Sequence, residues 1–195
     1  MILKILWTIR YLAYSFFLGK SGFPSYIGKP VFISRFNRLF IGKKVRIYPN
    51  CRIEIQDNRA CIIIEDDTSI AQNFHIISGC KQQLKIGKST TISANVFITN
   101  IEHNYQQTGK HILKQPLLSQ KTTIGENCFI GYGSVIQAGT VLGKQCIVGA
   151  NAVVRGTFPD YSVIVGIPAK IVKRYNESSG KWEKTNAKGE FTNEV

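Results

Sequence analysis

A six-residue period runs through Ile124-Gly-Glu-Asn-Cys-Phe, Ile130-Gly-Tyr-Gly-Ser-Val, Ile136-Gln-Ala-Gly-Thr-Val, Leu142-Gly-Lys-Gln-Cys-Ile and Val148-Gly-Ala-Asn-Ala-Val. An aliphatic residue opens each hexapeptide, and a small or compact residue follows four positions after most of them. On a helix, six steps of about 100° scatter the repeated side chains over three faces. On an extended chain, six is an even number, so they all point to one side. The segment therefore predicts short strands separated by bends, stacked so that neighbouring coils bury the aliphatic side chains.

The same period extends upstream, with interruptions. Coils of three hexapeptides begin at Ile41, Ile64 and Ile86. The spacing of these starts exceeds 18 residues by five and four, which predicts small insertions near Asp57-Asn58-Arg59 and Gly79-Cys80-Lys81. After Ile98, about 20 further residues leave the stack. A loop of that length within a compact repeat is either functional or disordered.

The repeat and its closing segment, Pro159-Asp-Tyr-Ser-Val-Ile-Val-Gly-Ile-Pro168-Ala-Lys170, resemble the C-terminal end of hexapeptide-repeat acyltransferases. The resemblance implies an all-β fold, a left-handed parallel β-helix in which three hexapeptides make one triangular coil. We accordingly expect an N-terminal amphipathic helix in residues 1–25, the β-helix in residues 26–169 with an excursion over residues 99–122, and a C-terminal extension in residues 170–195. The polar tail from Asn176 to Val195 is expected to be partly ordered at best.

Residues 2–18 form the only convincing helix in the sequence. It carries a narrow polar stripe opposite an aliphatic face, and the stripe consists of Lys4, Thr8, Tyr11 and Ser15. The segment is shorter than the ~20 apolar residues of a membrane span, and it lacks the cleavage site of a signal peptide. Two interpretations stay open. The helix lies in a membrane interface with Trp7, Tyr11 and Tyr14 at headgroup depth, or it covers the open end of the coil stack, and one helix could do both.

The net charge of +13 is unevenly distributed. No acidic residue precedes Glu54, whereas ten basic residues do: Lys4, Arg10, Lys20, Lys29, Arg35, Arg38, Lys43, Lys44, Arg46 and Arg52. Such one-sided charge indicates an anionic partner. The sequence has no recognition-helix pattern, zinc finger or aromatic ribonucleoprotein motif, so we expect no nucleic acid. An anionic membrane surface or a phosphorylated acceptor fits the charge better.

The cysteines and two of the histidines are expected to be structural. Cys51, Cys128 and Cys146 fall on the small-residue position of a hexapeptide, which favours inert filling of the coil interior in a reducing compartment. His75 and His111 are interpreted as structural or surface residues. Zinc carbonic anhydrases resemble this fold but need three histidines that meet at a subunit interface, and the histidine spacings here do not match their pattern. We therefore expect no metal.

The third histidine is the candidate catalytic residue. In the resembled family, sugar O-acetyltransferases carry a histidine where a long loop leaves the coil, often within Asp-His-x-His-x-Tyr. The matching residues, Ile98-Thr-Asn-Ile-Glu-His-Asn-Tyr105, place Ile101 at the first histidine and His103 at the second. The resemblance implies that His103 is the general base, and Glu102 and Asn100 are polar neighbours that could orient it. An unperturbed imidazole, with a pKa of about 6.5, can take a proton from a sugar hydroxyl and pass it to a leaving thiolate.

The resemblance also implies acetyl-CoA as the acyl donor. The residues that match the family's coenzyme positions are Gly131, Gly149, Ala150, Arg155, Lys170 and Lys173. The small residues permit close approach to the backbone, and the cations can pair with phosphate. The same glycines are also needed simply to turn the corners of the coils.

These features together lead to one expected function and two alternatives. We expect an acetyl-CoA-dependent O-acetyltransferase that acts on a sugar hydroxyl of a bacterial surface-polysaccharide precursor (lipopolysaccharide O-antigen, capsule or exopolysaccharide), free or lipid-linked. The resemblance implies a homotrimer with the active site between neighbouring subunits. A cytoplasmic location, peripheral on the inner face of the cytoplasmic membrane, fits that acceptor. The alternatives are an N-acyltransferase or small-molecule acetyltransferase acting on an amino sugar or serine, and a non-catalytic β-helical scaffold.

Overall fold

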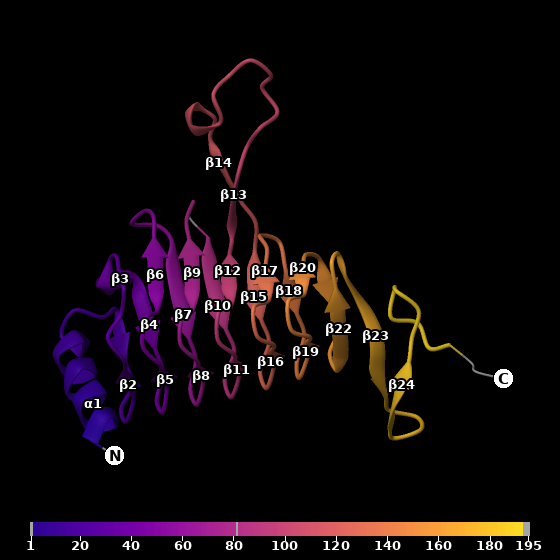
Figure 1. Ribbon diagram of the computed structural model, residues 1–195, viewed down its shortest axis with the longest axis horizontal. Coiled ribbons are helices and arrows are strands. Elements are labelled where there is room, and N and C mark those ends of the chain that lie inside the picture. The colour runs from indigo at the N-terminus through magenta and orange to yellow at the C-terminus, as the bar shows by residue number, and fades with distance from the viewer. Residues whose placement is uncertain (1, 81, 193–195) are drawn as a thin grey trace.

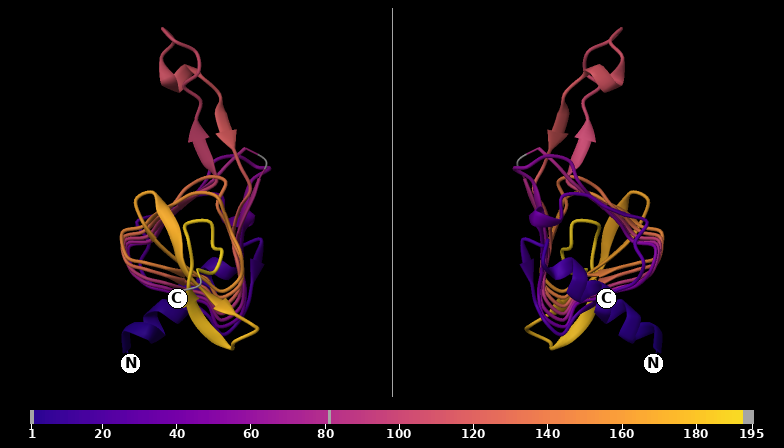
Figure 2. Two further views of the ribbon diagram at one scale, coloured as in Figure 1. Left: turned by 90° about the vertical axis from the view of Figure 1, so that its right-hand side faces the viewer. Right: turned by 90° about the vertical axis from the view of Figure 1, so that its left-hand side faces the viewer.

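The computed structural model describes residues 2–80 and 82–192 (Figure 1). Met1, Lys81 and residues 193–195 lie outside the described residues, although the expected helix, second insertion and C-terminal extension include them. The chain is a prism of stacked coils with a helix across one end and an arm that projects from one side (Figures 1 and 2). The predicted stack of parallel coils is confirmed.

Three parallel sheets form the sides of the prism, and each coil contributes one strand to each in turn. Sheet A contains β1 (Lys20–Ser21), β4 (Leu39–Ile41), β7 (Cys61–Ile64), β10 (Gln83–Ile86), β15 (Thr122–Ile124), β18 (Val141–Leu142) and β21 (Thr157–Phe158). Sheet B contains β2 (Tyr26–Ile27), β5 (Arg46–Ile47), β8 (Ser69–Ile70), β11 (Thr91–Ile92), β16 (Phe129–Ile130), β19 (Ile147–Val148) and β22 (Ser162–Gly166). Sheet C contains β3 (Phe32–Ile33), β6 (Arg52–Ile55), β9 (His75–Ser78), β12 (Phe97–Thr99), β17 (Val135–Ile136) and β20 (Val153–Val154). The 3₁₀ helix η1 (Phe36–Arg38) connects β3 to β4.

The aliphatic residue that opens each hexapeptide stacks on its counterpart in the next coil. The predicted coil starts Ile41, Ile64 and Ile86 are Cα partners along sheet A. Each is at most 1% exposed. Burying one such side chain stabilises the fold by about 1.5–3 kcal/mol, and only adjacent coils supply that burial. The small insertion at Asp57-Asn58-Arg59 forms the turn between β6 and β7, as predicted.

Asparagines turn the corner between sheets B and C. Asn50, Asn73 and Asn95 have φ values of 65°, 59° and 61°. Their amides form a ladder, in which Asn50 donates to Asn73 at 3.2 Å and Asn73 donates to Asn95 at 2.9 Å. Gly133 (φ 67°) occupies the equivalent position in the next coil, where a Cβ would come within 2.3 Å of the Asn151 Oδ1 atom. This corner is therefore rigid and leaves no room for a side chain at Gly133.

Helix α1 (Ile2–Ser15) covers the open end of the first coil (Figure 2). Tyr11 is 2% exposed, and its hydroxyl donates a hydrogen bond to the Gly22 carbonyl at 3.0 Å. Trp7 packs against Tyr26 and Tyr48, with ring centroids 5.7 and 5.5 Å apart. The helix ends at Ser15, three residues before the end of the predicted segment.

The structure confirms that α1 covers the open end of the coil stack. Trp7 and Tyr11 face the coil, and Tyr14 packs edge-on against Phe36 at 5.1 Å, so these three rings contact the protein. Sequence periodicity does not reveal which side of a helix meets the protein. Among the described residues, no helix is long and apolar enough to cross a membrane.

Antiparallel strands close the other end. β23 (Ala169–Asn176) turns back along β22, and β24 (Lys181–Lys184) pairs with β23. The expectation of a tail that is ordered only in part is wrong for residues 176–192. Aromatic and cation–π pairs order it despite its polar composition: Tyr175 packs on Trp182 at 5.9 Å, and the Arg174 guanidinium lies 5.8 Å from the Phe191 ring.

The cysteines fill the interior as predicted. Cys51 and Cys146 are fully buried, Cys128 is 2% exposed, and all five cysteines are free thiols. Burial raises the pKa of the Cys51 thiol to about 12, so this thiol is inert at neutral pH.

Candidate functional site

The excursion after β12 is an ordered arm. β13 (Ile101–His103) pairs with β14 (Leu117–Ser119) as an antiparallel hairpin, and the 3₁₀ helix η2 (Ile112–Lys114) lies in the tip that joins them. Gln115, which is 6% exposed, organises that tip. Its side chain accepts from the Gln107 amide and donates to the Gln107 and Lys110 carbonyls, each at 3.1 Å. A short internal network therefore orders the tip of the arm, which projects from the coils (Figure 1).

His103 is the last residue of β13, and its Cα pairs with that of Leu117. Its side chain is exposed. Among the described residues, none forms a hydrogen bond or an ion pair with the imidazole. The ring is therefore accessible to a second molecule, and the described residues provide no hydrogen bond that would orient it.

Glu102 anchors the arm. Consecutive side chains of a strand point to opposite faces, so Glu102 points away from His103. The Glu102 carboxylate accepts a hydrogen bond from Gln120 Nε2 at 2.9 Å and forms an ion pair with Arg155 at 3.0 Å. Glu102 therefore connects the arm to the corner after β20 and does not orient the imidazole of its own chain.

Asn100 is fully buried at the base of the arm. Its Oδ1 atom accepts from the Gly79 amide at 2.9 Å, and its Nδ2 atom donates to Ser78 Oγ at 3.2 Å. Its carbonyl accepts from the Gln120 amide at 2.9 Å. The structure thus brings Asn100, Glu102 and His103 to one arm, but their side chains lie in three different environments: the buried base of the arm, the ion pair with Arg155 and the solvent.

Part of the expected coenzyme set lies along the corner between sheets B and C. A Cβ at Gly131 would lie 2.6 Å from the Val148 carbonyl oxygen and 2.7 Å from the Ala150 nitrogen, and one at Gly149 would lie 2.8 Å from Val165. Backbone packing therefore requires Gly131, whereas a Cβ at Gly149 would displace the Val165 side chain. Ala150 is exposed beside them.

The expected cations are spread more widely. Lys170 pairs with Val165, so it continues the same corner at the end of the stack. Lys173 pairs with Val163, farther along β23. Arg155 follows β20 at the opposite edge of sheet C, where it meets Glu102. The structure thus groups Gly131, Gly149, Ala150 and Lys170, and separates Lys173 and Arg155 from them.

The other two histidines have structural partners. His111 Nδ1 accepts from the Leu113 amide at 3.2 Å and caps η2. His75 Nε2 lies 2.9 Å from the Glu54 carboxylate, which also accepts from Arg52 Nε at 2.5 Å. Burial alone would raise the pKa of Glu54, but the hydrogen bonds from Arg52 and His75 outweigh it and lower that pKa. Within residues 2–80 and 82–192, no group of three or more His, Cys, Asp or Glu side chains could hold a metal ion.

Comparison with known proteins identifies the family. A family model described as the hexapeptide repeat of succinyl-transferase matches residues 121–155. WbbJ of Escherichia coli K12, to which lipopolysaccharide biosynthesis O-acetyl transferase activity is ascribed, is 35% identical over 133 residues, which cover 65% of this chain and 67% of WbbJ. The chain belongs to the hexapeptide-repeat acyltransferases. Rv3034c of Mycobacterium tuberculosis, to which acetyltransferase activity is ascribed, is 29% identical over 174 residues, which cover 83% of this chain and 57% of that protein.

Solved structures share the fold of this acyltransferase. AntD, an N-acyltransferase from Bacillus cereus in complex with dTDP and 3-hydroxybutyryl-CoA, superposes with a TM-score of 0.73 at 18% identity, covering 87% of this chain and 90% of that one. A galactoside acetyltransferase in complex with coenzyme A gives a TM-score of 0.61 at 19% identity, covering 93% and 77%. At these identities the likeness shows the fold alone.

Sequence reasoning missed two features of the acyltransferase. Gln120 ties the arm to its base through Glu102 and Asn100, yet it is one polar residue at the end of an aperiodic excursion. The Glu54–His75 pair joins consecutive coils on the outer face of sheet C. The sequence separation could have predicted this pair, because the two residues lie 21 positions apart, which is close to the length of one coil plus its insertion.

Proposed function

We propose that this acyltransferase transfers an acetyl group from acetyl-CoA to a sugar hydroxyl of a bacterial surface-polysaccharide precursor. The observation that carries the proposal is the exposed imidazole of His103 on an arm that leaves the coils. The 35% identity to WbbJ supports the O-acetyl transfer and the class of acceptor.

His103 acts as the general base. It takes the proton from the acceptor hydroxyl while the oxygen attacks the thioester carbonyl, which forms a tetrahedral intermediate. Collapse of the intermediate breaks the carbon–sulfur bond, and the imidazolium returns the proton to the CoA thiolate. Acid–base catalysis of this kind contributes about 10²–10⁴-fold to the rate. Glu102 and Asn100 act as positioning residues, because their contacts fix the arm that carries the ring.

The acetyl-CoA site in this proposal follows the corner of Gly131, Gly149 and Ala150. Two side-chain-free positions on consecutive coils let an extended, amide-rich pantetheine chain approach the backbone. Lys170 at the end of this corner supplies positive charge for the phosphates, whereas Lys173 lies farther along β23. The CoA compounds in the AntD and galactoside acetyltransferase structures support this donor.

The active form in this proposal is a homotrimer with the site between subunits. The arm stands away from its own coils, and its Tyr105 and Leu113 are 71% and 70% exposed. The imidazole of His103 likewise lacks a partner among the described residues. A neighbouring copy would cover the apolar tip and complete the site. The acceptor is a lipid-linked glycan held at an anionic membrane surface, which is consistent with the basic N-terminal third of the chain.

Release of CoA thiol in the presence of candidate acceptors tests the proposal. Wild-type protein is assayed with sugars and glycans that offer only hydroxyls, with amino sugars and with serine. We expect turnover with a hydroxyl acceptor, and a loss of about 10²–10⁴-fold in His103→Ala. His75→Ala is the matched control, because that ring contacts Glu54 away from the arm. Undiminished turnover in His103→Ala would refute the catalytic assignment, and turnover confined to amino sugars or serine would refute the O-acetylation of glycans.

A further inference from the structure

The outward face of α1 is aliphatic. Its exposed side chains are Leu3 (63%), Ile5 (53%), Leu6 (51%), Ile9 (57%) and Leu12 (45%). The face that meets the coil carries aromatic and hydroxyl groups instead, including Trp7 and Tyr11. A helix that only covers a coil would place its most apolar side inward, because burial of aliphatic surface drives packing. The aliphatic residues on the outward side of α1 therefore indicate a second contact there, with another molecule.

Further apolar surface surrounds this face. Phe16 and Phe17 follow the helix at 87% and 67% exposure, and Phe23 in the first coil is 59% exposed. A shallow hollow of about 490 Å³ lies beside them, lined by Tyr14, Phe17, Phe36 and Asn37. Exposed apolar side chains that gather at one end of a molecule in this way mark an interaction site.

Cations accompany the apolar area. Lys4 lies on α1, and Lys20 and Lys29 are exposed in the first coil. In the described part of the chain, none of these three ammonium groups has an acidic partner within salt-bridge distance. Ion pairs begin only in the second coil, with Arg46–Asp67 and Arg52–Glu54. The Lys4 ammonium also lies 5.9 Å from the centroid of the Tyr26 ring, and Lys20 shares a surface hollow with Glu65 and Asp66. The N-terminal end thus combines aliphatic groups with lysines that form no salt bridge within the described residues.

We propose that this N-terminal end, namely the outward face of α1 with Lys4, Lys20 and Lys29, docks on an anionic lipid bilayer. The helix lies in the interfacial plane, its aliphatic side chains enter the boundary between headgroups and acyl chains, and the lysines meet lipid phosphates. Charge selects this occupant: no acidic residue precedes Glu54, so the surface complements an anionic partner and repels a second copy of itself. Figure 2 shows α1 lying across the end of the prism, with its N-terminus beyond the outline of the coils.

Docking fixes how far the arm stands from the membrane. The arm leaves the coil that contains β12, three coils from the first, and strands of adjacent coils lie about 4.8 Å apart. His103 then lies on the order of 15 Å from the first coil, and α1 adds about 10 Å between that coil and the membrane, if the stack stands upright. A sugar joined to a lipid through phosphates and a few residues spans that distance. This step rests on the proposed function, whereas the docking itself does not.

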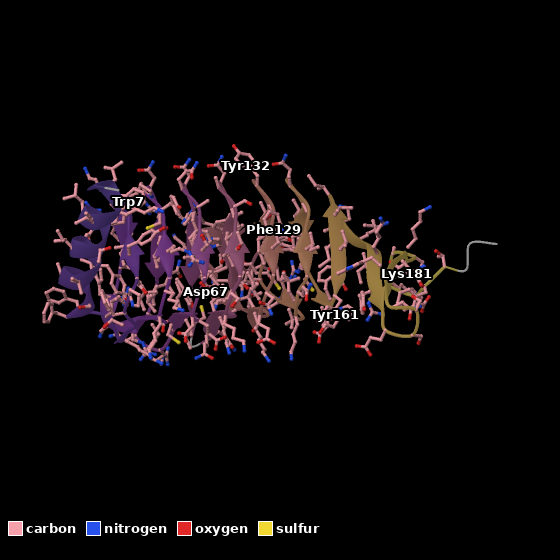
Figure 3. The ribbon with its side chains drawn as sticks, turned by 90° about the horizontal axis from the view of Figure 1, so that it is seen from below. Trp7, Asp67, Phe129, Tyr132, Tyr161 and Lys181 are labelled. Atoms are coloured by element: carbon pink, nitrogen blue, oxygen red, sulfur yellow. The ribbon has the colours of Figure 1, made fainter. Side chains whose placement is uncertain are left out.

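Flotation of the full-length protein with lipid vesicles tests the docking. The probes are phosphatidylcholine vesicles and vesicles that also contain phosphatidylglycerol. Leu6→Asp/Ile9→Asp places charge on the outward face, and Lys20→Gln/Lys29→Gln removes two cations. Lys181→Gln/Lys188→Gln makes the same charge change at the opposite end of the prism, where Figure 3 labels Lys181 far from Trp7. Thermal melts check each fold, and CoA release with a soluble acceptor checks the catalytic site independently.

We expect the wild type and the Lys181/Lys188 variant to bind phosphatidylglycerol vesicles equally. Each lost cation weakens binding about fivefold, so Lys20→Gln/Lys29→Gln loses about 25-fold. Leu6→Asp/Ile9→Asp abolishes flotation with an unchanged melt. Equal binding to both vesicle types, or an equal loss in the Lys181/Lys188 variant, would overturn the proposal. The proposal would also be overturned if the wild-type protein did not bind vesicles and sedimentation showed that it self-associates through α1. Turnover of a soluble acceptor does not depend on docking. An absence of such turnover in the wild-type protein would therefore count against the proposed function and not against the docking.

Discussion

The Glu102 carboxylate and the Arg155 guanidinium meet at 3.0 Å although the residues lie 53 positions apart. Glu102 is part of the arm that carries His103, and Arg155 follows β20, two coils beyond the point where the arm leaves the stack. The ion pair therefore bridges the outer edge of the coils and limits how the arm can tilt. Arg155 consequently has two competing assignments, a phosphate ligand of acetyl-CoA or an anchor of the arm.

Kinetics of Arg155→Ala and Glu102→Gln separate these assignments. If the pair positions the arm, both variants lower kcat by about tenfold and leave the KM for acetyl-CoA unchanged, because small displacements of a catalytic group are costly. Their effects are not additive in the double variant. A rise in the KM for acetyl-CoA in Arg155→Ala alone would instead assign Arg155 to the phosphates. Melting temperatures should hardly change, since exposed pairs contribute about 0–1 kcal/mol.

Asn100→Ala is expected to destabilise the protein by about 1–3 kcal/mol, because it leaves the buried Gly79 amide without its partner and removes the hydrogen bond that Ser78 Oγ accepts. The Ser78 hydroxyl still donates to the Cys61 carbonyl. Chemical denaturation measures this loss. Asn104→Ala is the matched control within the arm, where the side chain only accepts from the Gln106 amide. Equal stability of the two variants would contradict the structural role of Asn100.

The coils were predictable because each hexapeptide carries its own signal. Ile41, Ile64 and Ile86 mark their coils locally, and stacking requires no information from elsewhere in the chain. The arm and the C-terminal strands lack such a signal. Tyr175 and Trp182, for example, help to order the tail through a cross-strand contact, which composition cannot reveal.

The candidate site was predictable only as a set of positions. The motif located His103 and the point where the arm leaves the coils, but it did not show that Glu102 and Asn100 point elsewhere. Glu102 is held by Arg155 from a distant coil, and Asn100 by a corner formed earlier in the chain. Such tertiary contacts have no period in the sequence. The orientation of α1 was open for the same reason, since both of its faces offered plausible contacts.

The corner after β16 and β19 allows a test of the acetyl-CoA site that does not depend on stability. Ala150→Leu extends an exposed side chain into the proposed groove and should raise the KM for acetyl-CoA about tenfold or more, with an unchanged melt. Gly131→Ala is its counterpart, since the added Cβ meets backbone at 2.6 Å. That variant should lose about 1–3 kcal/mol of stability. An Ala150→Leu enzyme with wild-type KM would place the coenzyme elsewhere.

The Glu54 cluster should make stability fall at acidic pH. The folded-state pKa of Glu54 lies below its ordinary value of 4.5, because hydrogen bonds from Arg52 and His75 outweigh the effect of burial. The unfolded chain therefore takes up this proton at a higher pH than the folded chain. The stabilisation is fully present above pH 4.5 and is lost as the pH falls through the folded-state pKa.

Glu54→Gln should lower the melting temperature at pH 7 by up to about 4 °C, because a partly exposed pair contributes at most about 1 kcal/mol. The difference between wild type and variant should shrink towards pH 3, because wild-type Glu54 is then increasingly protonated. Glu126→Gln provides a comparison at a second partly exposed carboxylate, whose pKa Lys88 and Lys144 also lower. A difference between wild type and Glu54→Gln that stays constant from pH 7 to pH 3 would show that the Glu54 charge does not stabilise the fold.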